Sequence, residues 1–224
     1  MKEISMLLTN RNTLDFLKLA VKSMRENASN KLNELIIMDD GSTDDTVGIC
    51  ERLPYVSEVV RGRENEQDMD GCGFWGRDET NLRSRLWRVS TEHAGADGWI
   101  YIFDADHLLT GITPDDFRTL CRADHVNAWA FRLLDCWEAR DRHRVDGFWQ
   151  AWLHPRTWLL RGSPEHDFQP VWETRGIHAG HIPANYPLRT GIAPGFAAIQ
   201  HLGYVSAIDR AEKAQKYLDL GVSE

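Results

Sequence analysis

The sequence lacks the features that mark several large protein classes. Its four cysteines, Cys50, Cys72, Cys121 and Cys136, form no C-x-x-C pair, so the spacing of a structural zinc site is absent. We expect free, buried thiols, as in a reducing cytoplasm. No window approaches the roughly 18 uncharged apolar residues of a membrane span. The apolar run at the N-terminus meets Asn10 too early for a signal peptide. These absences predict a cytoplasmic protein without a transmembrane segment.

Basic residues are also too few for a protein whose main task is binding nucleic acid. The chain has 34 acidic against 26 basic side chains, a formal charge of −8. Phosphate backbones require clustered Lys and Arg, so no nucleic-acid partner is expected. A small anionic ligand remains compatible, because it needs only a local cation. The 224 residues, 42% of them hydrophobic, contain no internal repeat or low-complexity linker, which predicts one domain over 1–224.

The first half of the chain alternates between strand and helix patterns. Short apolar runs predict four strands, and helical spacing or start signals predict a helix after each of them. A charged, glycine-containing surface loop is expected over residues 61–79. Such alternation predicts an α/β sandwich with a mostly parallel central sheet. The strands are expected over 4–8, 34–38, 56–60 and 99–103, and the helices from about residue 14, over 44–53 and 80–92, and from Thr113.

The second half is less regular. Strands are expected over 126–133 and 157–161, separated and followed by stretches rich in Trp, Pro, His and Gly. The last helix is expected over 206–220, where Ser206 and Asp209 form an approximate capping box. We therefore divide the single domain into two halves, 1–125 and 126–224.

Polar clusters follow three of the expected strands, at Thr9–Arg11, Asp39–Asp40 and Asp104–Asp106. In parallel α/β sheets, ligands bind at the carboxyl ends of the strands, where such clusters meet. Each cluster alone is a weak signal, since Asp-Gly-Ser after Asp39 is more often a helix-capping turn. Three of them in one half of the chain predict a binding site.

The D-x-D segment is the most informative of these clusters. Asp104 and Asp106 follow a buried strand, and neighbouring carboxylates repel one another unless a cation or hydrogen-bond donors offset them. A hard divalent cation does this. It would also stabilise the charge that grows on a diphosphate leaving group when a nucleotide-sugar is cleaved. The competing interpretation is a solvated turn.

A resemblance supports the first interpretation. Residues 35–46, LIIMDDGSTDDT, resemble the segment that opens family 2 glycosyltransferases, and residues 100–107, IYIFDADH, resemble that family's strand and D-x-D motif. The two motifs stand in the right order and spacing. The resemblance implies a GT-A fold: a Rossmann-like α/β/α sandwich with a mostly parallel sheet and an irregular C-terminal half. Residues 1–125 would bind the nucleotide-sugar, and 126–224 the acceptor.

The resemblance also implies roles for single residues. Thr9 and Asp39 would contact the nucleobase, with Arg11 near the same pocket. Asp104 would face the ribose or a metal-bound water and so belong to the metal site. Asp106 would bind the metal directly.

An arginine on the helix before the D-x-D strand would approach the diphosphate. The family's usual Ala-Arg-Asn run is absent here, and residues 79–85 read ETNLRSR. Asn81, Arg83 and Arg85 are the candidates, and we take Arg85.

His201 is the candidate third metal ligand, because it lies just before the last helix, where many GT-A enzymes place a histidine. Two carboxylates and a histidine suit Mn²⁺ at least as well as Mg²⁺. The competing interpretation is a histidine hydrogen-bonded to backbone. His178 and His181 form an alternative pair, but they lack cysteine or acidic neighbours at zinc-site spacing.

An inverting transferase also needs a general base beside the acceptor hydroxyl. By position in the second half we take Asp167, with Glu165, Asp146 and Glu173 as alternatives. Each is equally compatible with an ordinary surface carboxylate.

The sequence thus predicts a metal-dependent, hexosyltransferase-like glycosyltransferase. Its donor would be a UDP-, GDP- or dTDP-sugar, and its acceptor a glycan, a lipid-linked sugar or another hydroxyl, with peripheral membrane contact in the lipid-linked case. One alternative is a sugar-1-phosphate nucleotidyltransferase, although no glycine stands in residues 9–13 to cradle a triphosphate. The other is a non-catalytic carbohydrate-binding module.

Overall fold

The computed structural model describes residues 4–10, 14–28, 34–39, 45–61, 79–147, 149–170 and 180–219. Arg11, Glu173, His178 and residues 62–78 of the loop expected over 61–79 therefore lie outside the described residues. The elements run along the chain in the order β1 (Ile4–Asn10), α1 (Leu14–Asn27), β2 (Glu34–Asp39), α2 (Thr46–Glu51), β3 (Val56–Arg61), α3 (Glu79–Ala94), β4 (Trp99–Asp104), β5 (His107–Thr110), α4 (Pro114–Arg122), β6 (Ala128–Asp135), the short 3₁₀ turn η2 (Ala151–Leu153), β7 (Arg156–Arg161), β8 (Thr190–Ile192), β9 (Ala198–His201) and α5 (Ala207–Asp219).

The strands form one mixed sheet in the order β3-β2-β1-β4-β7-β6-β9-β5, with β8 paired to β6. Strands β3, β2, β1 and β4 are parallel, whereas β7 is antiparallel to both β4 and β6. The parallel part is the half of the chain that the strand–helix alternation predicted. The predicted α/β sandwich with a mostly parallel sheet is confirmed, and each antiparallel pair includes a strand of the irregular second half.

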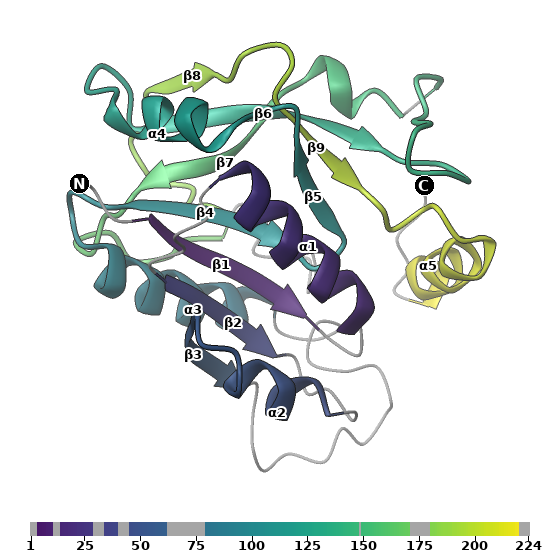
Figure 1. Cartoon of the computed structure of the whole chain (residues 1–224), viewed down its shortest axis with the longest axis horizontal. Helices are drawn as coiled ribbons and strands as arrows, with labels where there is room; N and C mark the ends of the chain where they lie inside the picture. The colour runs from purple at the N-terminus through teal and green to yellow at the C-terminus, as the bar shows by residue number, and fades with distance from the viewer. Residues whose placement is uncertain are drawn as a thin grey trace.

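Helices cover both faces of the sheet (Figure 1). Alternate residues of β4 point to opposite faces, as the two-residue repeat of a strand requires. Trp99, Tyr101 and Phe103 join the core beneath α1, α2 and α4, while Ile100 and Ile102 join a second core with Leu86 and Trp87 of α3. This burial on both faces explains why β4 reads as a continuous apolar run.

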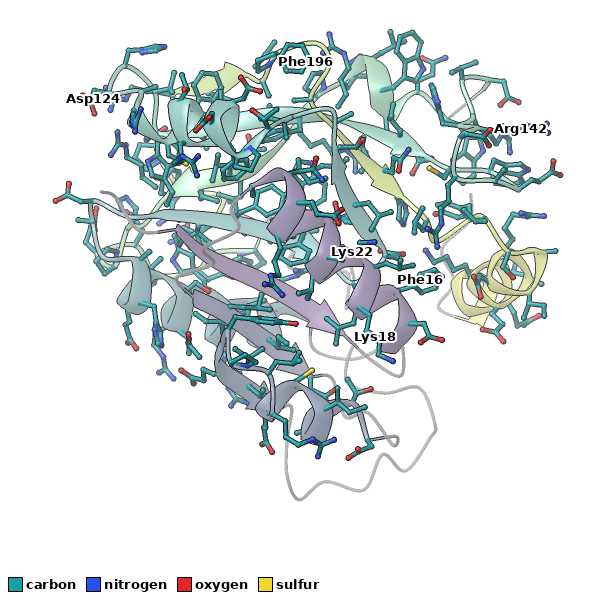
Figure 2. All side chains as sticks on the ribbon, viewed as in Figure 1. Phe16, Lys18, Lys22, Asp124, Arg142 and Phe196 are labelled. Atoms are coloured by element: carbon teal, nitrogen blue, oxygen red, sulfur yellow. The ribbon has the colours of Figure 1, made fainter. Side chains whose placement is uncertain are left out.

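The apolar residues whose spacing predicted helix α1 form its buried face. Leu17, Val21 and Met24 are buried against the sheet, whereas Lys18 and Lys22 are exposed (Figure 2). The Ser23 hydroxyl donates a hydrogen bond of 2.6 Å to the Leu109 carbonyl, which ties α1 to β5. The helix therefore fixes the strand that leads away from the D-x-D segment.

Strands β5 and β9 were not predicted, and they matter most for the site. They are only four residues each and pair antiparallel, with His107 opposite His201. Strand β9 also runs parallel to β6, where His201 lies opposite Asp135. This register carries a residue from the end of the chain to the D-x-D segment.

Helix α4 begins where its sequence predicts, and its first turn forms a capping box. The Asp116 amide donates to the Thr113 hydroxyl oxygen at 3.2 Å, and the Thr113 amide donates to the Asp116 carboxylate at 3.1 Å. We expect Thr113→Ala to lower the free energy of unfolding by about 1 kcal/mol, because one helix N–H loses its acceptor. Urea denaturation would measure this, with Thr113→Ser as the control that retains the acceptor. Equal stability of the Ala variant and the natural protein would contradict it.

Two further expectations concern the cysteines and the membrane. Of the four predicted buried thiols, Cys50, Cys121 and Cys136 are buried and outside any disulfide, and Cys72 lies outside the described residues. Within the described parts of the chain, the helices are too short or too polar to cross a membrane.

Candidate functional site

The carboxyl ends of β1, β2 and β4 meet at one edge of the sheet. Thr9 lies opposite Asp104 in the β1–β4 register, and Asn10 lies opposite Asp39 in the β1–β2 register. The Asp39 side chain is buried, with 3% of its surface exposed. The predicted polar clusters of these three strands therefore come together, as parallel strand ends do.

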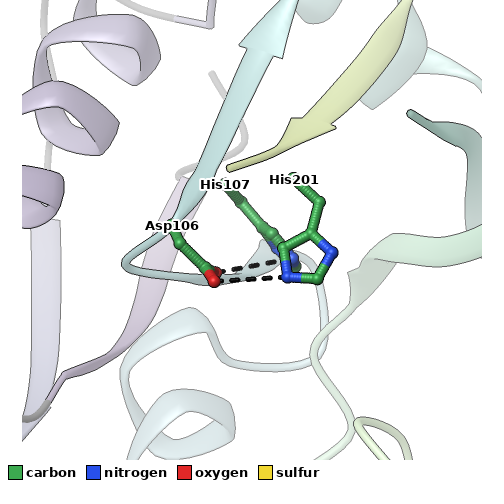
Figure 3. A group of neighbouring side chains, drawn as sticks. All are labelled: Asp106, His107 and His201. Atoms are coloured by element: carbon green, nitrogen blue, oxygen red, sulfur yellow. Dashed lines mark ion pairs between the residues drawn. The ribbon is translucent and has the colours of Figure 1, made fainter. Parts of the chain in front are cut away.

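Asp106 and His201 form the centre of the site (Figure 3). Asp106 Oδ2 lies 3.2 Å from His201 Nε2, and His201 Nδ1 lies 2.8 Å from Asp135 Oδ1. A proton on Nδ1 satisfies the Asp135 carboxylate, which turns Nε2 toward Asp106. This carboxylate–histidine arrangement orients metal-binding histidines in many proteins.

His107 lies beside this pair but acts differently. Its Nδ1 accepts a hydrogen bond from the Asp104 backbone N–H at 3.2 Å, so its Nε2 carries the proton of the neutral ring. That Nε2 lies 3.9 Å from both Asp104 Oδ2 and Asp106 Oδ1. Burial lowers the pKa of His107 and outweighs the two carboxylates. We interpret His107 as a neutral donor between the two aspartates.

Arg83, from α3, is the arginine that reaches the D-x-D segment. Its guanidinium lies 3.7 Å from Asp104 Oδ1, and the side chain is only 5% exposed. Arg85 on the same helix is exposed. The structure thus favours Arg83 over our choice of Arg85, because the residue two positions away turns to a different side of the helix.

Lys213 of α5 completes the cluster. Its Nζ lies 3.5 Å from Asp106 Oδ2, 3.4 Å from His201 Nε2 and 4.5 Å from the centre of the Tyr204 ring. The Tyr204 ring also packs edge-on against His201. Lys213 lies 107 residues from Asp106 in the sequence and was not predicted.

The charges in the cluster shift one another's protonation. Burial alone would raise the pKa of Asp106, but the nearby His201, Lys213 and His107 hold it well below its usual value. Burial would likewise lower the pKa of His201, but Asp106 and the hydrogen bond to Asp135 raise it to about 9. In the metal-free protein, therefore, Asp106 is ionised and His201 is protonated at neutral pH.

This shift predicts a pH-dependent stability in EDTA. The pKa of His201 is about 9 in the folded protein, against 6.5 for free histidine, so protonation of His201 stabilises the fold. This contribution is fully present below pH 6.5 and is lost as the pH rises through 9. We expect His201 to account for a loss of up to about 3 kcal/mol over that window. Denaturation curves from pH 6 to 10 would measure it against His201→Gln, which does not titrate. Identical pH slopes for the two proteins would refute the assignment.

The space between the ligand atoms suits a small cation. Asp106, His107 and His201 place one potential ligand atom each within 4.8 Å of one another. Gly203 borders this space: a Cβ there would lie 2.5 Å from Asp106 Oδ2 and 2.8 Å from His201 Nε2. The missing side chain thus leaves a space beside the two atoms that the Lys213 ammonium enters, 2.0 Å from where the Cβ would lie. A carboxylate and an imidazole suit Mn²⁺ or Mg²⁺.

Residues 5–69 match the protein family described as glycosyl transferase family 2. The predicted resemblance to this family is confirmed. The matched segment contains β1, β2 and β3, and so two of the three strand ends that form the site. The GT-A type arrangement expected from family 2 is likewise confirmed by the α/β/α layers and the parallel strand order.

Two bacterial proteins are similar in sequence to this chain. An uncharacterized glycosyltransferase of Mycoplasma genitalium is 22% identical over 137 residues, which are 61% of this chain and 43% of that protein. An uncharacterized protein of Mycobacterium bovis is 27% identical over 200 residues, 84% of this chain and 44% of that protein. The chain therefore spans less than half the length of each of these curated relatives.

Two solved structures are also similar. S. aureus TarS in complex with UDP is 16% identical with a TM-score of 0.44, covering 66% of this chain and 39% of that one. A mannosyltransferase from Pyrobaculum calidifontis, solved with GDP-Man and Mn²⁺, is 17% identical with a TM-score of 0.39, covering 58% of this chain and 35% of that one.

Of the remaining family 2 site predictions, His201 joins the D-x-D segment, while Asp104 contacts Arg83 and His107. The Thr9 side chain and all of Arg11 lie outside the part of the chain that the structure describes. Asp167 is exposed in the loop after β7. The neighbouring His166 carbonyl accepts a 2.6 Å hydrogen bond from Trp87 of α3, which anchors that loop.

Two neighbours of the site, Asp135 and Lys213, were missed by sequence reasoning, whereas His181 was named only in an alternative pair with His178. Asp135 and Lys213 stand outside any motif, and only the fold brings them to His201. His181 packs on Trp158, which in turn packs edge-on against His107. Burial and nearby Arg83 lower the pKa of His181 to about 3, so it is a neutral part of the site's wall.

Proposed function

We propose that this chain is a glycosyltransferase domain that transfers a sugar from a nucleotide-sugar to a hydroxyl acceptor with a divalent metal. The observation that carries the proposal is the Asp106–His201–Asp135 arrangement at the strand ends of a family 2 fold. The bond between the sugar's anomeric carbon and the diphosphate oxygen breaks, and a bond to the acceptor oxygen forms. The nucleoside diphosphate leaves, and the acceptor proton passes to a base.

The nucleotide would bind over the ends of β1 and β2. Thr9 and Asp39 are the candidates for base contacts, with Asp39 accepting from a ring N–H, and Arg11 would lie near the same pocket. The buried position of Asp39 at the end of β2 supports this role, because a desolvated carboxylate discriminates strongly between bases. The same geometry leaves UDP-, GDP- and dTDP-sugars as candidate donors.

Asp106 and His201 would hold Mn²⁺ or Mg²⁺, with Asp104 facing the ribose or a metal-bound water. When bound, the metal supplies positive charge to the departing diphosphate. The His107 Nε2–H faces both aspartates, 3.9 Å from an oxygen of each. Arg83 compensates Asp104 from the other side, where an exposed arginine such as Arg85 would have to move inward.

Asp167 remains our candidate base, because its exposed side chain in the loop after β7 is open to an acceptor. Glu165 is hydrogen-bonded to Ser163, and Asp146 is paired with Arg144 at 2.6 Å, so both already have partners. These contacts favour Asp167 among the described alternatives.

Calorimetric titration of UDP, GDP and dTDP, with Mn²⁺ and with EDTA, tests the proposal. We expect one nucleotide to bind only when the metal is present, and the matching nucleotide-sugar to be slowly hydrolysed. Condensation of a nucleoside triphosphate with a sugar-1-phosphate would favour a nucleotidyltransferase instead. Glycan binding without nucleotide binding would favour a carbohydrate-binding module.

A further inference from the structure

Lys213 is placed where a bound metal would have to be. Its Nζ contacts both atoms proposed as metal ligands, at 3.5 Å from Asp106 Oδ2 and 3.4 Å from His201 Nε2. These two atoms are themselves 3.2 Å apart. The side chain of Lys213 is 32% exposed, so α5 inserts it into the site from solvent.

Gly203 shows how small the shared space is. A Cβ at this residue would lie 2.0 Å from Lys213 Nζ as well as close to Asp106 Oδ2 and His201 Nε2. A metal bound to the last two atoms needs distances of about 2.1 Å from each. The ammonium and the metal would therefore lie within a few ångströms of one another, where two positive charges repel.

Two contacts hold Lys213 in this place without the metal, against the repulsion between its ammonium and the protonated His201. Asp106 offers its charge, and the Tyr204 ring lies beneath the ammonium at 4.5 Å. Both contacts favour a cation. The ammonium therefore has a second partner besides Asp106.

We propose that Lys213 is a built-in competitor of the divalent metal at Asp106 and His201, and that metal binding displaces its ammonium from Asp106. This rests on the proposed function, because it assumes that those two residues are metal ligands. The donor's diphosphate, which attracts both cations, would then relieve the competition. Metal and donor binding are thereby coupled through one side chain.

Mn²⁺ binding without nucleotide tests the competition directly. The free-Mn²⁺ signal in electron paramagnetic resonance would be titrated against the natural protein, Lys213→Met and Lys213→Arg. We expect Lys213→Met to bind Mn²⁺ on the order of tenfold more tightly, and Lys213→Arg to resemble the natural protein. Lys22→Met, at an exposed position on α1, makes the same change of net charge and should leave the affinity unchanged. Lys213→Gln is a second neutral variant in case the Met variant folds poorly.

Each other outcome overturns the proposal in a recognisable way. Equal or weaker Mn²⁺ binding by both neutral variants would show that Lys213 does not compete, while leaving the metal site intact. Absence of Mn²⁺ binding by all variants would refute the metal site itself. Nucleotide binding in EDTA that is lost in Lys213→Met would show that the lysine replaces the metal.

Discussion

Asp106→Asn should abolish metal-dependent nucleotide binding and lower sugar transfer by on the order of 10³-fold. Asp106 is the only carboxylate among the three grouped potential metal ligands of the described chain, and an amide is a much weaker ligand than a carboxylate. The variant also leaves His201 and Lys213 without the charge that both contact. Steady-state kinetics with the active donor and Mn²⁺ titrations would measure both effects.

Asp115→Asn is the matched control for this substitution. Asp115 is 89% exposed at the start of α4, so the same chemical change there should leave transfer and Mn²⁺ affinity unaltered. Circular dichroism would verify that both variants fold. Full Mn²⁺-dependent activity of Asp106→Asn would eliminate this residue as a metal ligand.

Gly203→Ala should block the metal site without removing any ligand. The added methyl carbon would stand 2.5 Å from Asp106 Oδ2 and 2.8 Å from His201 Nε2, closer than side-chain atoms tolerate. It would occupy the space that the metal needs. We expect the affinity for Mn²⁺ to fall by about 100-fold or more. In other metal sites, loss of a residue that supports a ligand lowers the affinity by up to about 100-fold.

Gly195→Ala is the control for Gly203→Ala, since a Cβ at Gly195 meets its nearest atom, on Arg132, only at 3.7 Å. This variant should bind Mn²⁺ normally. Thermal denaturation separates the two explanations of a loss: a blocked site with an intact fold, or a strained fold. Unchanged Mn²⁺ affinity in Gly203→Ala would place the metal elsewhere.

The parallel half of the fold was predictable because its signals are local. Strands β1 to β4 are buried on both faces, so their apolar runs stand out, and the polar residues after them mark the strand ends. Residues 35–46 and 100–107, which resemble two family 2 motifs, then indicated which of these strand ends would bind the nucleotide and which the metal. Asp39, Asp104 and Asp106 needed no long-range information.

The half of the site that we propose to bind a metal depends on contacts between distant parts of the chain. Asp135 and His201 are 66 residues apart, and Asp106 and Lys213 are 107 apart. No local pattern encodes such pairs. His201 was identified only by its position before the last helix, while Asp135 and Lys213 were missed. The sequence alone could not decide between Arg85, our choice, and Arg83. The orientation of a helix around its axis depends on packing, here of α3 against the sheet.

The pairing of β5 with β9 has a consequence for the fidelity of folding. Side chains alternate between the two faces of a strand, so a slip of β9 by one residue would turn His201 away from Asp106 and bring Gln200 opposite His107. Such a molecule would retain its parallel sheet and its nucleotide-facing edge. The metal site that we propose at Asp106 and His201 would therefore be complete only in molecules whose β9 has paired with β5 in this register.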